Sequence, residues 1–569
     1  MDTRSYRYIP YCDGGTPSVT IKGEPKILYY IYYYNINNPS TEHAETIRLD
    51  SSGNGYIKWE SDNIIFRIDP GPDTSTFEAE IKGCNVSGFY GWKLNTLTVS
   101  CSTYYRPNLD KIFNNYPNLR HLIFEGFDTS KATTMSSMFN NCSGLTELDV
   151  SHFNTSNVTD MNNMFGGCSG LTELDVSHFN TSNVTDMSNM FNGCSGLTSL
   201  DLSGWNMSNV TLMNGMFYNC RRLTSIDVSN FNTSGVTDMS WMFFGCTSLT
   251  SLDVINFNTS NVTSMRSMFN FCIGLTSLDL INFNTSNVTD MGGMFCDCKK
   301  LKSLYVSNFD TSNVTNMGYM FEGCFGLTSL DLSKFNTSNV TDMGGMFSWC
   351  YKLTSLDLSN FNTSNVTDMN EMFYKCYNLT SLDLSNFNTS NVTTMNSMFA
   401  SCNGLTSLDV SNFNTSNVTD MNSMFQHCSG LTSLDVSNFN TSNVTSMSEM
   451  FRDCSGLTSL NLSKWDTSNV TDMSNMFNCC SGLTSLDLRN FNTSNVTYMG
   501  GMFYDCRSLT SLDLSGWDMT NVTNTNYMFA GCYKLKTIRM VGCNQETIDK
   551  IKSSLTNDDI IYQVTIITE

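Results

Sequence analysis

Cysteine has the most conspicuous chemistry in this sequence, and its spacing indicates how that chemistry is used. Sixteen of the 22 cysteines lie 26 residues apart, beginning with Cys142. Disulfide frameworks and zinc sites need cysteines in close pairs such as C-x-x-C. The two close pairs, Cys296/Cys298 and Cys479/Cys480, do not have that spacing. We interpret the periodic cysteines as small buried side chains. The alternative is oxidation between stacked neighbours, because adjacent turns bring Cα atoms within disulfide range.

Histidines and carboxylates, the usual acids and bases of enzymes, show no active-site pattern. None of the five histidines lies in a metal-binding or nucleophile motif, and no glycine-rich phosphate loop is present. The carboxylates form a periodic ladder rather than a pair whose environments separate an acid from a base. We expect a non-catalytic protein with no cofactor and no metal; a hydrolase within residues 1–90 is the enzymatic alternative. The histidines are His43, His121, His152, His178 and His427.

Aspartate occupies one outward position in most repeats and forms what we call the acidic strip. Like charges directly opposite on neighbouring strands are destabilising, so something should offset their repulsion. One interpretation is solvation, with hydrogen bonds from flanking Ser and Thr. The other is a strip that binds cations or a basic ligand, since calcium favours several carboxylates. Tyr305, Asn461 and Arg539 interrupt the series. The strip comprises Asp149, Asp175, Asp201, Asp227, Asp253, Asp279, Asp331, Asp357, Asp383, Asp409, Asp435, Asp487 and Asp513.

Aromatic residues replace the usual Asn, Ser and Gly at variable positions of the central repeats. They are interleaved with Lys299, Lys300, Lys352 and Lys375. Exposed aromatic side chains are candidate anchors of an interface; chance variation between repeats is the alternative. This candidate binding patch, called the aromatic patch below, comprises Trp241, Phe244, Phe271, Tyr319, Phe325, Trp349, Tyr351, Tyr374 and Tyr377, with Ile273 beside them.

A repeat of 26 residues positions all of these side chains. One unit, Leu145 to Gly170, reads LTELDVSHFNTSNVTDMNNMFGGCSG. In its first part Leu148 and Val150 alternate with polar residues, which predicts a short strand with one buried face. The segment Asn154 to Asn157 then predicts a polar turn, because its side chains bond to their own backbone.

The second part of the unit predicts a short helix. Its apolar residues recur at intervals of three and one, which places them in one stripe facing the strand. Thr159 is the expected N-cap, and Asp160 complements the helix dipole in the first turn. The stripe is formed by Val158, Met161, Met164, Phe165, Cys168 and Leu171.

A single strand–turn–short helix unit cannot bury its own apolar face, so the units must stack. We therefore predict an α/β repeat solenoid, a leucine-rich-repeat-like stack with sixteen in-register strands from Leu145 to Leu535 and with Met and Phe columns in its core. Degenerate forerunners of the strand begin at Leu94 and Leu119. The predicted domains are a small all-β N-terminal domain that could anchor the solenoid (1–88), degenerate capping repeats (89–144), regular repeats (145–543) and a helix–strand cap (544–569).

Two ends of the chain lie outside the regular repeat. The first is β-rich and the last reads as a helix, Gln545–Leu555, followed by a strand, Ile560–Ile567. The β-rich segments are Ser18–Ile21, Ile27–Ile36, Ala44–Leu49, Ile64–Ile68 and Phe77–Ile81.

The charge balance limits the partners. With 31 Lys+Arg against 52 Asp+Glu the net charge is -21, which disfavours nucleic acid and anionic membranes. No run of 18 apolar residues predicts a transmembrane segment, and Met1 to Gly15 lacks the apolar stretch of a signal peptide. Glycosylation sequons such as Asn154-Thr155-Ser156 recur in nearly every repeat. Because two glycans per turn would crowd a tight stack, we expect a source that does not glycosylate them.

The phrase FNTSNVTDMxxMFxxCxxLTSLDLS, repeated from about Phe127 to Leu535, resembles the BspA-like leucine-rich-repeat family. More narrowly, it is similar to the 26-residue surface-protein and lipoprotein repeat of bacteria and some protists. The resemblance covers nearly three quarters of the chain and implies adhesion or binding to host proteins at a cell surface. The chain departs from common leucine-rich repeats, which carry asparagine at the position of Phe153, and from members with an export signal or surface anchor.

These observations together lead us to expect a binding or adhesion protein. Its solenoid would present an extended face to a protein or glycan partner, outside the cell or at its surface. The alternative is a structural component of a virion or appendage, such as a phage tail or head fibre or a receptor-binding protein, anchored by the N-terminal domain to other subunits of a larger assembly.

Overall fold

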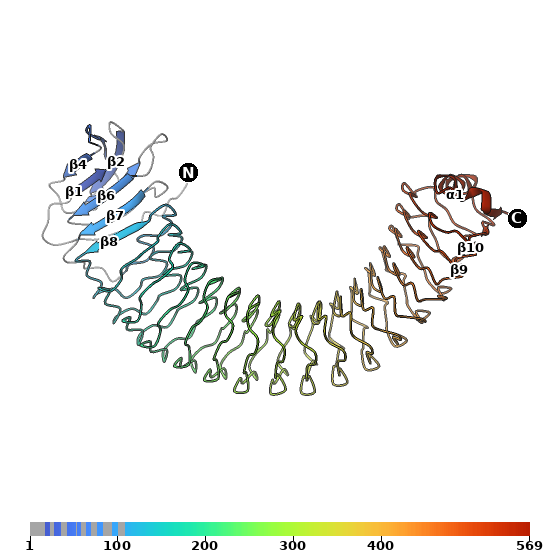
Figure 1. Ribbon diagram of the computed structural model, residues 1–569, viewed down its shortest axis with the longest axis horizontal. Coiled ribbons are helices and arrows are strands. Elements are labelled where there is room, and N and C mark those ends of the chain that lie inside the picture. The colour runs from blue at the N-terminus through green and yellow to red at the C-terminus, as the bar shows by residue number, and fades with distance from the viewer. Residues whose placement is uncertain are drawn as a thin grey trace. The chain divides into compact units, whose positions relative to one another are not determined.

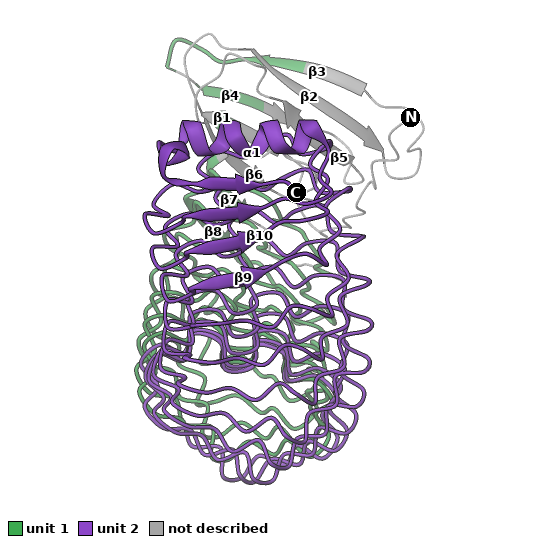
Figure 2. Cartoon of the chain, turned by 90° about the vertical axis from the view of Figure 1, so that its right-hand side faces the viewer, with its two compact units in different colours: residues 1–264, 268–278 green, residues 265–267, 279–569 purple. Residues whose placement is uncertain are grey.

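One 26-residue repeat makes one turn of a solenoid, and the chain is a repeat β-solenoid of about 18 turns with very few helices. The computed structural model contains two compact units, residues 1–264 with 268–278, and residues 265–267 with 279–569 (Figure 2). No helix among the described residues combines the length and apolar character needed to cross a membrane. The described residues are 18–22, 28–35, 43–52, 54–58, 64–69, 77–82, 94–100 and 108–569.

The strands that precede the regular repeats form two sheets in unit 1. A five-stranded sheet has the order β4-β1-β6-β7-β8, and a three-stranded antiparallel sheet has the order β3-β2-β5. The five predicted β-segments correspond to β1, β2, β3, β5 and β6; β4 was not predicted because its Asn-Gly start is a turn signal. Their bounds are β1 (Ser18–Lys22), β2 (Leu28–Asn35), β3 (His43–Arg48), β4 (Asn54–Lys58), β5 (Ile64–Asp69), β6 (Phe77–Lys82), β7 (Leu94–Ser100) and β8 (His121–Glu125).

A separate all-β domain over residues 1–88 is not supported. Strand β6 pairs in parallel with β7, and β7 pairs in parallel with β8, so the N-terminal sheet continues into the first turns of the solenoid (Figure 1). The predicted forerunner strands are confirmed, with Leu97 opposite Leu122 and Val99 opposite Phe124. Alternating residues predict a strand but do not state which neighbour completes its hydrogen bonds. For that reason the sequence suggested a boundary where the sheet has none.

The first part of each repeat is extended, as predicted. In the unit Leu145–Gly170, Leu148 and Val150 are buried while Glu147 is exposed. Backbone hydrogen bonds to the preceding turn are long on this side; the Thr146 N–H donates to the Arg120 carbonyl at 3.3 Å. Regular ladders form in three of the sixteen predicted strands, which corrects the prediction of sixteen paired strands. These three pair in parallel and are β9 (Ser485–Asp487), β10 (Ser511–Asp513) and β11 (Thr537–Arg539).

The second part of each repeat is not the short helix that its apolar spacing predicts. The N–H groups of Met161 and Phe165 donate to carbonyls of the next turn, at 3.0 and 2.9 Å. Between them, the Met164 N–H closes a tight turn onto the Met161 carbonyl at 3.1 Å. An α-helix would satisfy its N–H groups inside its own segment. The segment is therefore a run of tight turns bonded to its neighbour, and Thr159 is not an N-cap.

Two backbone positions in every turn explain why no helix forms. Asn163 and Gly167, four residues apart, have φ angles of 53° and 73°. The left-handed conformation interrupts a right-handed helix, and it costs roughly 1–2 kcal/mol for a residue with a side chain. Asn, Gly and Ser are frequent at the first position and Gly and Asp at the second, and these residues tolerate left-handed turns. This residue preference indicates left-handed turns, whereas the spacing of the apolar residues indicates a helix.

The polar phrase NTSNVT holds one turn to the next. The buried hydroxyl of Thr155 donates to the Asn180 carbonyl at 3.0 Å and accepts the Asn180 N–H at 2.8 Å. The side-chain amide of Asn157 donates to the Ser130 carbonyl at 2.8 Å. Equivalent bonds recur along the solenoid, as at Thr363 and Asn365. The phrase repeats because each of these side chains completes a backbone group of a neighbouring turn.

The apolar columns form the core, which confirms their structural interpretation. Phenylalanines stack in parallel, with the rings of Phe165 and Phe191 5.7 Å apart at 7°. The Cys168 thiol, fully buried, donates to the Phe139 carbonyl at 3.1 Å. Burial raises the pKa of this thiol well above its usual value. The cysteines among the described residues are free thiols.

The C-terminal cap follows the prediction closely. Helix α1 (Gln545–Asn557) begins after Asn544, whose side chain accepts the Thr547 N–H at 2.8 Å, and it buries Ile551 and Leu555. A short 3-10 helix η1 (Ile561–Gln563) precedes β12 (Thr565–Ile567), which pairs in parallel with β11. The predicted helix is confirmed, and the predicted final strand is shorter than expected.

Candidate binding surfaces

The acidic strip lies on the outer side of the extended segments, with twelve of its carboxylates exposed and Asp513 half-exposed. In each turn the carboxylate closes a small turn of its own; Asp357 accepts the Ser359 N–H at 3.0 Å. The serine hydroxyl and then its N–H lower the pKa of Asp357 below the usual range. The same bond occurs at Asp149 and Asp435, both at 2.9 Å. This geometry fits solvated carboxylates held by flanking serines, and cation binding stays a prediction.

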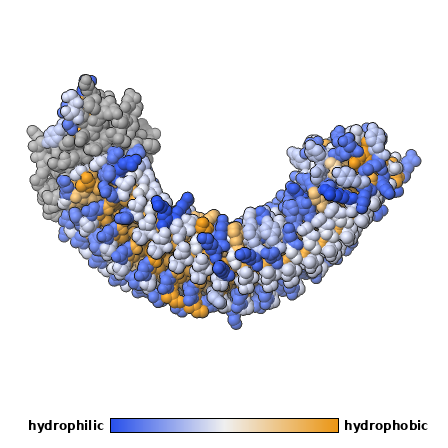
Figure 3. Space-filling view, viewed as in Figure 1, coloured by the Kyte–Doolittle hydropathy of each residue, from blue (hydrophilic) through white to orange (hydrophobic). Residues whose placement is uncertain are grey.

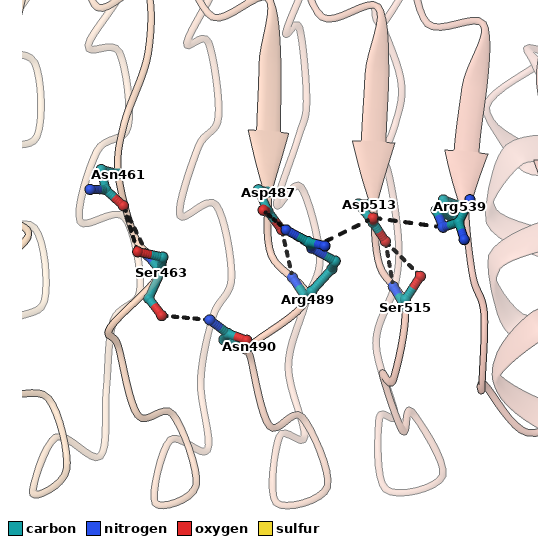
Figure 4. A network of polar contacts seen from close by, with 8 residues as sticks. All are labelled: Asn461, Ser463, Asp487, Arg489, Asn490, Asp513, Ser515 and Arg539. Atoms are coloured by element: carbon teal, nitrogen blue, oxygen red, sulfur yellow. Dashed lines mark hydrogen bonds and ion pairs between the residues drawn. The ribbon is translucent and has the colours of Figure 1, made fainter.

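Arginines offset the repulsion near the last turns of the strip (Figure 4). Arg489 donates two hydrogen bonds to the Asp487 carboxylate, from Nε at 2.9 Å and from a terminal nitrogen at 2.6 Å. Its Nε also lies 3.8 Å from Asp513, which Arg539 approaches at 3.9 Å from the other side. Arg539 was expected only to interrupt the strip, and Arg489 was not predicted as a site residue, although its place two residues after Asp487 in an extended segment was a usable signal.

A second carboxylate column, assigned wrongly to the first turn of a helix, lies half-buried beside the tight turns. The Asp160 carboxylate accepts the Asn162 N–H at 2.8 Å. The backbone of Asp160 forms a parallel β-bridge with that of Asp186 in the next turn. Burial raises the pKa of Asp160, and the charge of Asp186 adds to the effect. In the part of the chain that the structure describes, no three His, Cys, Asp or Glu residues are grouped to hold a metal ion. The carboxylates of this column shape the tight turns.

The two histidines that share a repeat column act separately. The Nδ1 atom of His152 lies 2.9 Å from the Ser151 hydroxyl. The Nε2 atom of His178 lies 2.9 Å from the Val150 carbonyl. Each ring is therefore engaged by local polar groups rather than by the other histidine.

Four variable positions of each turn, occupied in the first regular unit by Asn163, Gly166, Gly167 and Ser169, account for most of the aromatic patch. Two of these positions are the left-handed ones, where bulky side chains are disfavoured. Apolar side chains reach the visible surface in rows along the turns (Figure 3). Within the patch and beside it, bulky residues with left-handed backbones are Trp241 (φ 57°), Phe271 (φ 58°), Tyr319 (φ 58°), Trp349 (φ 61°) and Lys375 (φ 58°); outside it, Lys111, His427 and Tyr527 share this conformation.

Unit 1 holds three residues of the aromatic patch. The ring of Phe244 lies 5.6 Å from that of Phe271. On its other side it stacks on Tyr218 at 4.6 Å, a partner that the sequence analysis did not name. Trp241 and Phe271 are exposed by 37% and 40%. This group is small, but its rings are surface residues as expected.

Unit 2 brings five residues together, and we call these the aromatic cluster: Phe325, Trp349, Tyr351, Tyr374 and Tyr377. Phe325 stacks on Tyr351 at 4.7 Å, and Tyr351 stacks on Tyr377 at 5.0 Å. Trp349 lies beside this stack, 5.6 Å from Tyr351, and meets Tyr374 edge to face at 5.8 Å. Residues from three successive turns therefore form one continuous surface.

Two lysines place their ammonium groups over rings of the aromatic cluster. The Lys375 Nζ lies 3.6 Å from the centroid of the Trp349 ring and 4.8 Å from that of Tyr374. The Lys299 Nζ lies 5.3 Å from the centroid of Phe325, at one end of the stack. A cation over an aromatic face contributes about 0.5–1 kcal/mol at an exposed site. These contacts help to hold the rings of the cluster in their positions.

Tyr319 is the member of the patch in unit 2 that does not belong to the aromatic cluster. Its ring covers Gly345 of the next turn, where an added Cβ would lie 2.3 Å from the ring. Tyr319 is 40% exposed, so it borders the surface without joining the stack.

Comparison with known proteins identifies the repeat. The model of a family described as Mycoplasma protein of unknown function, DUF285, matches the chain in five overlapping segments, residues 107–225, 194–303, 274–381, 341–459 and 428–541. These segments span the regular repeats and most of the capping repeats. No curated protein matches the chain.

Proposed function

We propose a binding function for this chain, which belongs to the DUF285 family of proteins of unknown function. Its buried columns build the solenoid, and its aromatic cluster binds a partner without catalysis. The more specific relation we propose is to the BspA-like surface repeat, which favours adhesion or receptor binding at a cell surface. The phrase FNTSNVTDM and the 26-residue period support that relation.

The observation that carries the proposal is the choice of residues at the left-handed positions. Most other repeats place Asn, Gly, Ser or Asp there, as at Asn163, Gly323 and Ser401, which the backbone accepts more readily. His427 and Tyr527 are bulky exceptions, but neither belongs to a stack of surface rings among the described residues. Trp349 and Lys375 occupy the same position in two successive turns, each at a cost of roughly 1 kcal/mol. Backbone strain of this kind is concentrated at functional sites. Stability does not require these residues, because neighbouring turns fold without them.

The structure of the polar phrase supports a source that leaves the sequons unmodified. The Asn157 side-chain nitrogen, where a glycan would be attached, donates to the Ser130 carbonyl of the preceding turn at 2.8 Å. A glycan there would replace one of the two hydrogens on this nitrogen and crowd its close contact with the neighbouring turn.

A binding screen with a double variant tests the proposal. The wild-type chain and the variant Trp349→Ser with Tyr351→Ser are applied to immobilised host-surface proteins and to a glycan array. We expect the wild type to bind at least one of them and the variant to bind more than tenfold more weakly, because central aromatic residues dominate interfaces. The melting temperature should stay nearly unchanged, because both side chains are only half-buried.

A matched control uses aromatic residues outside the aromatic cluster. Tyr504→Ser with Tyr533→Ser removes two exposed tyrosines from unit 2, at variable positions equivalent to those of Tyr374 and Tyr351. This control should bind like the wild type. If the wild type binds nothing in the screen, or if both variants bind like the wild type, the aromatic cluster is not the binding surface.

A further inference from the structure

The rings of the aromatic cluster present edges to solvent rather than faces. In the column Phe325, Tyr351, Tyr377 the planes are inclined by only 15° and 26°, so the faces pack on one another. The far face of Phe325 lies under the Lys299 ammonium, and the Trp349 ring lies under that of Lys375. Within this column of three rings, the second face of Tyr377 alone has no ring or ammonium over it among the contacts of the described residues.

Ring edges carry partial positive charge, because the negative charge of an aromatic quadrupole lies over the faces. The stack therefore offers a partner a narrow apolar strip that favours oxygen acceptors at its margin. Tyr377 is 36% exposed, which leaves this edge accessible.

Exposed lysines add full positive charges at positions that follow this column in the repeat. Lys352 follows Tyr351 directly, and Lys300 follows Lys299, whose ammonium covers Phe325; Lys302 lies one position beyond the next core leucine. Lys299 itself lies 3.4 Å from Asp297 and Lys375 is near Glu371, so those two charges are partly compensated. The basic character around the stack thus rests on Lys300, Lys302 and Lys352, in a chain whose net charge is -21.

We propose that the aromatic cluster of unit 2 binds an acidic segment of a partner protein, whose carboxylates meet Lys300, Lys302 and Lys352 while an apolar side chain packs on the ring edges. This inference rests on the proposed binding function and specifies the chemistry of the partner. Complementary charges at the margin of an interface set its specificity and its association rate.

Two other occupants fit the cluster less well. A sugar packs on aromatic faces, and the column of three stacked rings leaves one such face, on Tyr377. A second copy of the chain would bring another net charge of -21 to the surface, which opposes association. Both occupants are outcomes that the following experiment distinguishes.

The test uses the full-length chain and a copolymer of glutamate and tyrosine as the acidic probe. We expect the wild type to bind the copolymer, with weakening by added salt. Lys300→Glu with Lys302→Glu should weaken binding about tenfold, because both charges are reversed. The matched control is Lys534→Glu with Lys536→Glu, since these exposed lysines occupy the equivalent positions of a later repeat that lacks stacked rings. The control should bind like the wild type.

Each other outcome overturns the inference. Absence of copolymer binding, or equal weakening by both lysine pairs, excludes an acidic segment at this surface. Binding to a glycan that disappears in Trp349→Ser with Tyr351→Ser assigns the cluster to a sugar, and self-association of the wild type that this variant abolishes assigns it to a second copy. In these last two cases the proposed binding function stands; it fails if the wild type binds nothing or if the serine variant leaves all binding intact.

Discussion

The repeats that carry the aromatic cluster, residues 301–378, and the repeats that follow, residues 379–456, share one core and differ on one surface. Thr363 in the first group and Thr389 in the second are both fully buried and make the same two hydrogen bonds. At the variable positions, Trp349 of the first group corresponds to Ser401 of the second. The comparison shows that the residues that join the turns and the residues of the proposed binding surface occupy different positions of the same repeat.

This separation follows from the way the turns are bonded. The buried columns and the NTSNVT phrase complete backbone groups of neighbouring turns, so a change there affects two turns at once. The variable positions lie on the tight turns, where the backbone is already bonded to the next turn through Phe347 and Trp349 at 3.0 and 2.7 Å. Their side chains are free to vary without disturbing those bonds.

The largest predicted effect concerns the shared core. Thr363→Val and Thr389→Val should each lower the free energy of unfolding by about 2 kcal/mol, because each buried hydroxyl is the partner of both a backbone N–H and a carbonyl of the next turn. Chemical denaturation of the full chain measures this loss. Thr393→Val is the control; this threonine is exposed, and its backbone bond to Thr367 remains, so the loss should stay below about 0.5 kcal/mol. Unequal losses at Thr363 and Thr389 would break the equivalence of the two groups.

A smaller effect concerns the variable turn. Gly345→Ser places in the first group the residue that the second has at the same position, Ser397. The change should lower the free energy of unfolding by about 1–2 kcal/mol, because φ is +60° and the Cβ meets the Tyr319 ring. In the background Tyr319→Ala the steric part disappears, so about half of the loss should be recovered in a double-mutant cycle. Equal losses in both backgrounds would show that the ring moves aside.

The smallest effect concerns the acidic strip, which runs through both groups. Asp357→Asn and Asp435→Asn should leave the melting temperature nearly unchanged at neutral pH, because both carboxylates are exposed. Hydrogen bonds from the neighbouring serines lower the pKa of both carboxyl groups. A lowered pKa stabilises the fold above the unfolded value of about 4, and this contribution is lost as the pH falls through the lowered pKa. The variants should therefore show a weaker loss of stability in acid.

Calcium distinguishes the two interpretations of the strip. Each turn supplies one carboxylate, already engaged by a serine, so millimolar calcium should leave the melting temperature within about 1 °C. A clear rise in the wild type that Asp357→Asn reduces would assign the strip to cation binding.

The columns of the core could be predicted from the sequence because a 26-residue period places equivalent residues of successive turns next to one another. Cys168 and Phe165 must meet their own counterparts in the next turn, whatever the backbone does between them. The helix could not be judged in the same way, since spacings of three and one also arise from successive tight turns. The left-handed angles at Asn163 and Gly167 decide that question.

The candidate site shows the same division. The sequence indicated which surface residues break the consensus, such as Trp349 and Tyr351, but not their contacts. It placed Tyr319 in the same group, although this ring covers Gly345 outside the stack. Arg489 was not predicted, because its contact with Asp513 of the next turn exists only when the turns are stacked.

By itself, then, the sequence determined the period, the buried columns and the outward residues. Each position of a repeat stacks on its own counterpart, so the residue type found at that position indicates whether the column is buried. The tertiary structure decided how the backbone N–H groups are shared between turns. It also decided which aromatic faces remain open, because both depend on the distance between neighbouring turns. A single repeat does not contain that distance; it arises only when one turn lies on the next.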